Sequence, residues 1–312
     1  MTSSAPRTRR PTAGGPDGVV LLDKPLGLTS NQALQRVKRL FEARKAGHTG
    51  SLDPLASGLL PICLGQATRF SGYLLDAPKA YRVSGRLGSR TSTGDAEGEI
   101  IEQCAWDHVG RAGFEAALLR FRGPSRQVPP MYSALKQGGE ALYRKARRGE
   151  TVERAPREIE ISALELVAWE PPEFGLDLRC SKGTYVRSLV EDIAVAVASC
   201  AHVTALRRYA AGPYDDCRMH SLDTLKELAI KGPQALATAL LATDTALDGL
   251  PQLQLDEEDA RRLAQGKIIA TDAGAGVGLV RLYAAGHFLG VGARDAGGKL
   301  RVRRLLDTSG DG

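Results

Sequence analysis

The stretch from Gly47 to Phe70, GHTGSLDPLASGLLPICLGQATRF, places one acid and one histidine ahead of an apolar run. The acid, Asp53, precedes a proline, which keeps the backbone of the residue before it out of the helical region. A carboxylate held on such a fixed backbone suits covalent or acid–base chemistry. By spacing alone, however, the favoured interpretation is that Asp53 caps a helix beginning near Pro54.

Strands and helices alternate around this loop, which predicts an α+β unit with interleaved elements. The expected elements, in chain order, are a strand at 19–22, a helix at 30–41 capped by Ser30, a helix or buried segment at 54–64, a helix at 66–75, a strand around Tyr81 and Val83, a helix at 109–120, a Pro-rich loop leading into a basic helix near 142–150, and a strand, strand, helix order over 157–199.

The bulk composition is that of a globular protein. The chain has 312 residues, of which 43% are hydrophobic and 25% charged, and this length predicts about two domains. Its net charge of +6 fits a polyanionic partner without requiring one. No apolar run approaches the length of a membrane span, so we expect no membrane contact and a cytoplasmic location.

The cysteines and glycine-rich segments predict no bound metal, disulfide framework or cofactor. The five cysteines are widely spaced, without a CxxC or Cys/His ligand pattern, and are interpreted as reduced thiols. The chain has no P-loop motif, and GAGVG at 274–278 lacks the strand and helix that a dinucleotide loop requires.

Both ends of the chain differ from its middle. Residues 1–17 are rich in Pro, Gly, Ser and Thr, without an apolar stretch, and are predicted to be a disordered tail. Residues 244–251 resemble a junction, and the segment after it reads as one acidic-capped helix and three short strands of a small barrel-like module. We therefore expect domains at 18–247 and 248–312, each with its own core.

Six motifs, in order, resemble the TruB family of bacterial tRNA pseudouridine-55 synthases. They are LLDKPLGLTSNQAL, GHTGSLDPLASGLLPICLGQATRF, KAYRVSGRLGSRTSTGDAEGEI, QVPPMYSALKQGGEALYRKARRGE, CSKGTYVRSLVEDIA and AHVTALRRYAAGPY. Together they cover roughly residues 18–214. The tail GLVRLYAAGHFLGVGARDAGGKLRVRRLL resembles the PUA-type C-terminal module of such enzymes.

The resemblance implies a fold and a reaction. The fold would be a pseudouridine synthase catalytic domain, with a mixed or antiparallel sheet and flanking helices, followed by a small β-barrel-like PUA-type domain. The reaction would detach uracil from the ribose of uridine 55 in the tRNA T-loop, turn the base and rejoin it through carbon 5. Because the same atoms enter and leave, this isomerisation needs no cofactor and no metal.

The resemblance also assigns roles residue by residue. Asp53 matches the catalytic aspartate, Arg187 the arginine that pairs with it, and Tyr81 the tyrosine that stacks on the target base and helps to move its proton. Tyr185 and Leu206 match residues that line the uridine pocket.

His48 matches the histidine that contacts the T-loop around the flipped base. Without the resemblance, each of these residues has a simpler interpretation. His48 would be a polar surface residue and Arg187 a solvated helix residue. The remaining three would serve ordinary packing: Tyr81, Tyr185 and Leu206.

The expected partner is tRNA, held at its T-arm and on its acceptor-stem side by a protein that we expect to be a monomer. Two basic stretches could contact its phosphates. They are Arg144, Lys145, Arg147 and Arg148 in the first, and Lys299, Arg301, Arg303 and Arg304 in the second.

Two other classes compete with this assignment. A non-catalytic RNA-binding protein would not need Asp53, Arg187 and Tyr81 together. A hydrolase using Asp53 as nucleophile would need a metal site or a second catalytic carboxylate, and the sequence indicates neither.

Overall fold

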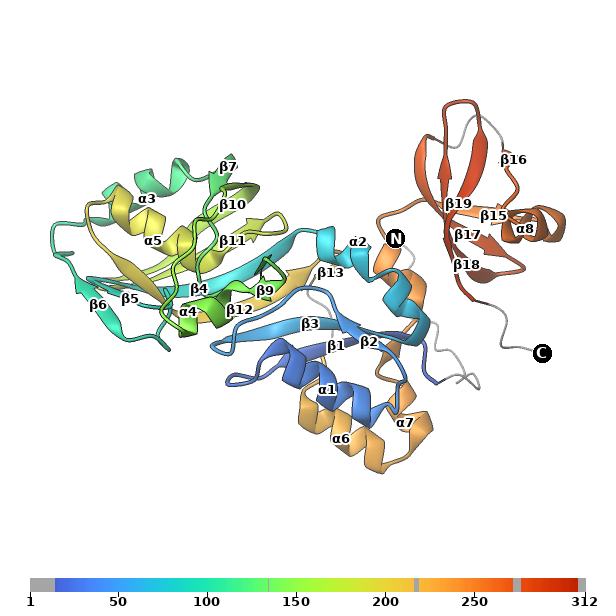
Figure 1. Cartoon of the computed structure of the whole chain (residues 1–312), viewed down its shortest axis with the longest axis horizontal. Coiled ribbons are helices and arrows are strands. Elements are labelled where there is room, and N and C mark those ends of the chain that lie inside the picture. The colour runs from blue at the N-terminus through green and yellow to red at the C-terminus, as the bar shows by residue number, and fades with distance from the viewer. Residues whose placement is uncertain (1–14, 134, 216–218, 272–275, 308–312) are drawn as a thin grey trace.

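A computed structural model describes residues 15–133, 135–215, 219–271 and 276–307 of the chain. Its centre is one mixed sheet, which runs through most of the molecule (Figure 1). In spatial order the strands are β14 (Leu240–Leu241), β1 (Gly18–Lys24), β3 (Ala56–Leu64), β12 (Ala201–Ala211), β4 (Lys79–Leu87), β11 (Glu173–Cys180), β10 (Arg157–Glu170) and β7 (Gly123–Gln127), with β2 (Ala46–His48) beside β3 and β13 (Tyr214–Asp215) beside β12. Strands β3 and β12 run parallel, and the other neighbours are antiparallel.

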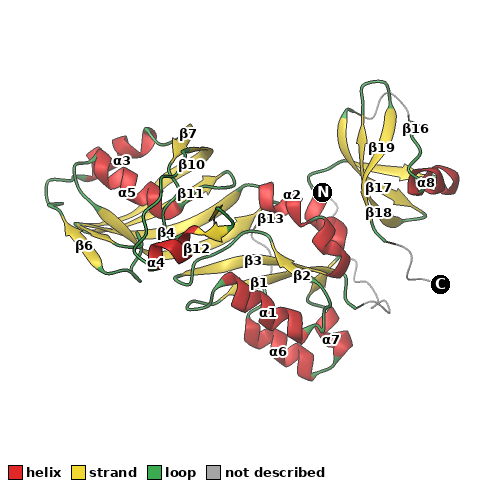
Figure 2. Ribbon diagram, in the orientation of Figure 1, coloured by secondary structure: helices red, strands yellow, loops and turns green. Residues whose placement is uncertain are grey.

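Helices pack against this sheet in two groups, as Figure 2 shows. The helices are α1 (Ser30–Leu40), α6 (Leu222–Ile230) and α7 (Pro233–Ala237) near β1 and β3, and α3 (Arg111–Leu119) and α5 (Val186–Ala196) near β10, β4 and β12. Their apolar sides and the sheet form the main hydrophobic cluster, which includes Leu22, Val37, Leu60, Phe114 and Val190. No helix in the described part of the chain is long and apolar enough to cross a membrane.

The segment after Asp53 is a strand, whereas the sequence left open a helix or another buried segment. Strand β3 is buried along nearly its whole length, because it lies between β1 and β12 in the middle of the sheet. Such a strand is apolar on both faces, so its sequence lacks the alternation that identifies a half-buried strand. Gly58 is required there: it has φ +100°, and a Cβ would lie 2.2 Å from the Arg208 carbonyl oxygen.

The region after β3 contains less continuous helix than predicted. The expected helix at 66–75 is split into the 3-10 helix η1 (Gly65–Arg69) and the short helix α2 (Ser71–Asp76). The cap of α1 is shifted by one residue: Thr29, not Ser30, is the N-cap, and its side chain and that of Gln32 form a capping box. Ser30 is thereby free for another contact, described below.

Two small hairpins project from the catalytic part of the chain. Strands β5 (Ser89–Thr91) and β6 (Ile100–Gln103) form one, and β8 (Lys136–Gln137) and β9 (Glu140–Ala141) form the other, which leads into helix α4 (Leu142–Arg147). The expected basic helix is therefore confirmed as α4, whereas the start of the expected Pro-rich loop, at Gly123, is instead strand β7, paired with β10.

A disulfide between Cys104 and Cys200 corrects the prediction of reduced thiols. Cys104 follows β6 and Cys200 precedes β12, 96 residues later in the chain, with a Cα–Cα distance of 5.8 Å. The fold brings these residues together, and their spacing in the sequence carried no sign of it. Cys63 and Cys180 are free and buried, and Cys217 lies outside the described residues.

The C-terminal part forms a separate five-stranded sheet with one helix. Its strands, in spatial order, are β15 (Gln252–Leu255), β17 (Gly278–Ala284), β18 (His287–Arg294), β19 (Lys299–Leu305) and β16 (Ile269–Ala270), and its helix is α8 (Glu257–Ala264). The three strands expected from sequence are β17, β18 and β19. Asp256 caps α8, whose first turn carries three further acids.

Each expected domain keeps a hydrophobic cluster of its own, but the two parts of the chain also share one. A second hydrophobic cluster joins the catalytic sheet to the C-terminal sheet, next to η1, α2 and the 3-10 helix η2 (Thr243–Leu247). Phe70 packs against Phe288 with ring centroids 5.5 Å apart, and Phe288 packs against Tyr283 at 5.6 Å. The C-terminal sheet does keep a small cluster of its own, around Leu263, Leu282 and Leu300.

The predicted tail is described only at its end. Residues 1–14 lie outside the described residues, and the Asp17 side chain accepts a hydrogen bond of 2.7 Å from the backbone N–H of Gln66. The tail therefore meets the rest of the chain before β1 begins.

Candidate active site

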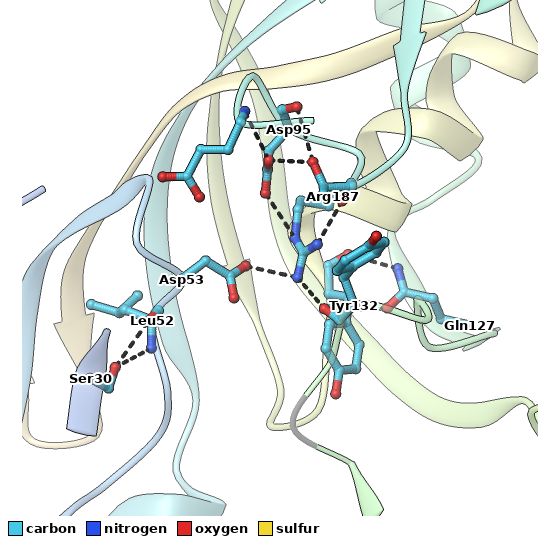
Figure 3. Close-up of polar contacts among 10 residues, drawn as sticks. Ser30, Leu52, Asp53, Asp95, Gln127, Tyr132 and Arg187 are labelled. Atoms are coloured by element: carbon cyan, nitrogen blue, oxygen red, sulfur yellow. Dashed lines mark hydrogen bonds and ion pairs between the residues drawn. The ribbon is translucent and has the colours of Figure 1, made fainter. Parts of the chain in front are cut away.

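The loop that carries Asp53 is fastened at several points. Ser30 Oγ accepts a hydrogen bond of 2.7 Å from the N–H of Leu52 and donates one of 3.0 Å to its carbonyl oxygen (Figure 3). The N–H of Gly27 donates to the carbonyl oxygen of Pro54 at 2.9 Å. Because no helix begins at Pro54, Asp53 has no helix to cap, and that interpretation is excluded.

Asp53 forms an ion pair with Arg187, the second residue of α5. The distance from Asp53 Oδ2 to Arg187 Nη2 is 2.9 Å. The two side chains differ in exposure, at 42% for Asp53 and 6% for Arg187. The arginine is thus a buried anchor, and the carboxylate is the member of the pair that a substrate can reach.

Arg187 is itself held by three further groups. Its Nη1 donates to the carbonyl oxygen of Thr93 at 2.6 Å, and its Nη2 to that of Tyr132 at 2.7 Å. Asp95 Oδ2 lies 3.6 Å from its Nε. Asp95 is fixed in turn, because its Oδ1 accepts from Thr93 Oγ1 at 2.6 Å and from the N–H of Glu97 at 3.1 Å.

The electrostatics of this group leave Asp53 less acidic than an ordinary aspartate. Burial is the main cause that raises the pKa of Asp53, and the nearby negative charge of Asp95 raises it further. The charge and hydrogen bond of Arg187 act in the opposite direction without cancelling the effect of burial. A carboxylate with a raised pKa is more basic and holds its charge less firmly, which suits a group that reacts.

A cavity of about 390 Å³ opens beside this ion pair. Five of the six predicted site residues line it together: Asp53, Tyr81, Tyr185, Arg187 and Leu206. They come from the loop before β3, from β4, from the end of the loop before α5, from α5 and from β12. The fold therefore brings together residues that are up to 153 positions apart (206 − 53 = 153).

The two tyrosines of this cavity are held differently. Tyr81 is 9% exposed, and burial raises the pKa of its hydroxyl. Tyr185 is clamped by its backbone: its N–H donates to Gln127 Oε1 at 2.8 Å, and its carbonyl oxygen accepts from Gln127 Nε2 at 3.0 Å. Gln127 thus positions the residue that leads into the helix of Arg187.

His48 lies in a neighbouring cavity of about 580 Å³, rather than in the one with Tyr81. This second cavity also reaches Asp53 and Arg187, and Tyr132 and Tyr143 contribute to its wall. Burial lowers the pKa of His48, with the charge of Arg208 as a second cause, so the imidazole is neutral at pH 7. Its Nδ1 is buried and has no hydrogen-bond partner within the part of the chain that the structure describes.

Several residues of this site were not found from the sequence. Asp95 and Thr93 belong to a polar loop, STGDAEG, and the sequence analysis assigns them no role. Gln127 ends β7 and Tyr132 lies in the loop after it, and they act through an amide and a backbone carbonyl, for which sequence provides no signal. The concentration of hydroxyls around one acid in STGDAEG was the available indication that this carboxylate is hydrogen-bonded.

Known proteins are similar to this chain along nearly its whole length. Three family models match consecutive segments: the N-terminal domain of TruB family pseudouridylate synthases at 38–186, the tRNA pseudouridylate synthase B C-terminal domain at 187–248, and the C-terminal model of pseudouridine synthase II TruB at 251–306. A tRNA pseudouridine synthase B from Chromohalobacter salexigens is 48% identical over 295 residues, which cover 94% of this chain and 95% of that protein. The protein of the same name from Pseudomonas aeruginosa is 48% identical over 291 residues, covering 93% and 95%.

The chain belongs to the TruB family of pseudouridine synthases. Solved structures agree on the fold. A Cbf5–Nop10–Gar1 complex matches with a TM-score of 0.72 at 23% identity, over 97% of this chain and 92% of that one. An H/ACA RNP bound to a substrate RNA containing 2'-deoxyuridine matches with a TM-score of 0.71 at 22% identity, over 93% and 85%. The predicted α+β pseudouridine synthase fold is thus confirmed for this TruB family member.

Proposed function

We propose that this TruB family enzyme converts uridine 55 in the T-loop of tRNA to pseudouridine, with Asp53 as the group that acts on the sugar. The observation that carries the proposal is the ion pair between Asp53 and Arg187 at the wall of a cavity that also contains Tyr81, Tyr185 and Leu206. Relatives named tRNA pseudouridine synthase B, at 48% identity, support tRNA as the substrate.

The chemistry exchanges one bond for another. The bond from N1 of uracil to carbon 1′ of the ribose breaks, the base turns, and a bond from its carbon 5 to carbon 1′ forms. The proton on carbon 5 leaves and N1 gains one, so atoms and charge balance. The Asp53 carboxylate oxygen serves as a nucleophile or an equivalent base at the sugar, and Arg187 keeps it ionised and directed.

The charges around the cavity favour this bond breaking. Uracil that departs with the bonding electrons carries a negative charge until it rejoins the sugar. Arg187 and Lys79 line the cavity, and Asp53 is the only carboxylate among the described residues that line it. This excess of positive charge stabilises an anionic base in a partly enclosed site, where electrostatic interactions are stronger than in water.

The two neighbouring cavities suit a flipped nucleotide and the loop that it leaves. Extrusion of a stacked base costs a few kcal/mol and is offset by contacts in an apolar and aromatic pocket. We place the target base between Tyr81, Tyr185 and Leu206, and the surrounding T-loop in the cavity of His48, Tyr132 and Tyr143. His48, with a neutral imidazole, would meet the RNA there.

We propose that the C-terminal sheet is a PUA-type module that binds the acceptor-stem side of the tRNA. Lys299, Arg301 and Arg303 alternate along β19 and are exposed, as phosphate-binding residues must be. The other basic stretch is partly neutralised, because Arg148 pairs with Glu140 and Glu150 at 2.7 Å each. We further expect the protein to act as a monomer, in the cytoplasm and without a cofactor.

The test is pseudouridine mapping on an unmodified tRNA transcript treated with the purified protein. We expect one modified position, uridine 55. Asp53→Asn keeps the side-chain shape and removes the charge, so we expect it to bind tRNA and form no pseudouridine. The exposed Asp223→Asn is the matched control and should act as the wild type does. Modification at another position, or turnover by Asp53→Asn, would refute the assignment.

A further inference from the structure

Arg208 is a buried cation directly beneath the candidate active site. It is 1% exposed and lies on β12, in register with Tyr81 of β4 on one side and Gly58 of β3 on the other. Burial of a guanidinium is unfavourable unless its hydrogen bonds are satisfied, so its partners indicate its purpose.

The partners of this guanidinium all belong to the site. Its Nε donates to the carbonyl oxygen of Leu59 at 2.7 Å, and its Nη2 to that of Gly50 at 3.1 Å. Tyr81 is its cross-strand partner on β4 and lines the same cavity. Within the described residues none of these partners is a carboxylate, so its charge is left to act on the cavity that it lines with Tyr81.

Arg208 therefore lies between two parts of the candidate site, the loop that carries Asp53 and Tyr81 on β4. Gly50 lies three residues before Asp53, has φ +127°, and would place a Cβ 3.5 Å from Arg208 Nη1. The loop of Asp53 thus approaches the guanidinium closely from one side, and Tyr81 lies across from it on β4. Removing the guanidinium would release the contact with Gly50 and take its charge away from Tyr81.

The neighbouring Arg207 shows what an ordinary arginine on this strand does. It points to the other face of the sheet and forms two hydrogen bonds with Asp23, of 3.0 and 2.8 Å, at the partly exposed surface. Arg208, one residue later, has the opposite orientation, no such partner and almost no exposure. The pair therefore supplies an internal comparison for the experiment.

We propose that Arg208 is a positioning residue, which holds the Tyr81 hydroxyl next to the Asp53 loop and stabilises negative charge on its oxygen while it relays a proton of the base. This inference rests on the proposed function of Tyr81. It adds a residue that acts through Tyr81 rather than on the substrate. The charge of Arg208 opposes the effect of burial on the pKa of Tyr81, which agrees with this role.

The first test is a double-mutant cycle in single-turnover pseudouridine formation on whole tRNA. Loss of a preorganised positive charge beside Tyr81 predicts that Arg208→Met lowers the rate about ten- to a hundred-fold, with little change in the Kd for tRNA. Arg208→Lys should recover part of the rate, and Arg207→Met should retain all of it. In a Tyr81→Phe background, Arg208→Met should cause almost no further loss, because its target is gone.

The second test follows Tyr81 itself, by ¹⁹F NMR titration of protein labelled with 3-fluorotyrosine. The Tyr81 signal is assigned as the one that Tyr81→Phe removes. If Arg208 stabilises the ionised hydroxyl, Arg208→Met raises the pH at which this signal titrates, and Arg207→Met does not. If Arg208→Met only loosened the packing, water would reach Tyr81 and the signal would titrate at a lower pH, because burial is what raises the pKa of Tyr81. The other charged or titratable groups that act on this hydroxyl are Cys180 on β11 and Asp53.

The outcomes separate this inference from the proposed function. If the wild type makes no pseudouridine, the proposed function fails, and the NMR titration still tests the link between Arg208 and Tyr81. If the wild type is active, the inference is overturned by any of three results: an unchanged rate in Arg208→Met, fully additive losses with Tyr81→Phe, or a Tyr81 signal that titrates no later in Arg208→Met than in the wild type. Loss of folding in Arg208→Met leaves Arg208→Lys to carry both tests.

Discussion

The cluster shared by the two sheets predicts that a residue of the C-terminal sheet stabilises the catalytic domain. Phe288 on β18 is the sharpest probe, because it contacts Phe70 of the catalytic part and Tyr283 of its own sheet. We expect Phe288→Ala to weaken the catalytic domain although it removes no atom from it. If Phe288 packed only within its own sheet, the same substitution would affect the C-terminal sheet alone.

The magnitude follows from burial and ring contacts. Phe288 is 9% exposed, so almost all of its side chain is lost from the core. Replacing a buried Phe by Ala costs about 3–5 kcal/mol, and each tilted aromatic pair adds about 0.5–1.5 kcal/mol beyond burial. Because the cluster lies between two sheets that can close partly over the gap, we expect the lower end, about 3 kcal/mol.

The assay is denaturant unfolding followed by tryptophan fluorescence. Both tryptophans of the chain, Trp106 and Trp169, belong to the catalytic part, so this signal reports on that part alone. We expect its midpoint to fall in Phe288→Ala and to stay unchanged in the exposed Val277→Ala. An unchanged midpoint in Phe288→Ala would show that the sheets unfold independently, and would refute the argument from the shared cluster.

Three further predictions concern the reaction and the RNA. Burial raises the pKa of Asp53, and the ionised carboxylate is the form that reacts. As the pH is lowered, the single-turnover rate should therefore begin to fall at a higher pH than the usual pKa of an aspartate would predict. A rate that falls only at the usual pKa of an aspartate would contradict this. Tyr81→Phe should bind tRNA more tightly than Tyr81→Leu, since stacking on an aromatic ring is worth about 1–3 kcal/mol per base, and equal Kd values would argue against stacking. Replacing Lys299, Arg301 and Arg303 by Gln should weaken tRNA binding and make its dependence on salt shallower, by about one unit of slope for each lost phosphate contact; an unchanged slope would mean that β19 does not touch the RNA.

The local sequence predicted the elements that carry their own signal. The alternation around Tyr81 marked β4, and the apolar spacing after Ser30 marked α1. The local sequence did not identify β3 as a strand, because burial on both faces removes the alternation of apolar and polar residues. It also did not predict the disulfide between Cys104 and Cys200, which only the folded chain brings together. These failures share a cause, because in each case the deciding neighbour is far away in the sequence.

The candidate site shows the same division. Asp53 was identifiable as a carboxylate on a restrained backbone, yet its role was chosen over helix capping only through the family resemblance. Asp95 and Ser30 were missed, since one acts through Arg187 and the other through the backbone of Leu52. Sequence reasoning thus reached residues that line the cavity, and not those that hold them in place.

Arg208 shows the same limit, because residues 201–211 carried no prediction of a strand. The structure makes this segment strand β12. Side chains along a strand alternate between the two faces of a sheet, so residues two apart share a face. Leu206, which the resemblance assigned to the pocket, and Arg208 therefore both lie at the cavity, while Arg207 lies on the opposite face. A charged residue is ordinarily expected on the solvent side, and here the alternation of a strand that only the folded chain reveals places one in the core.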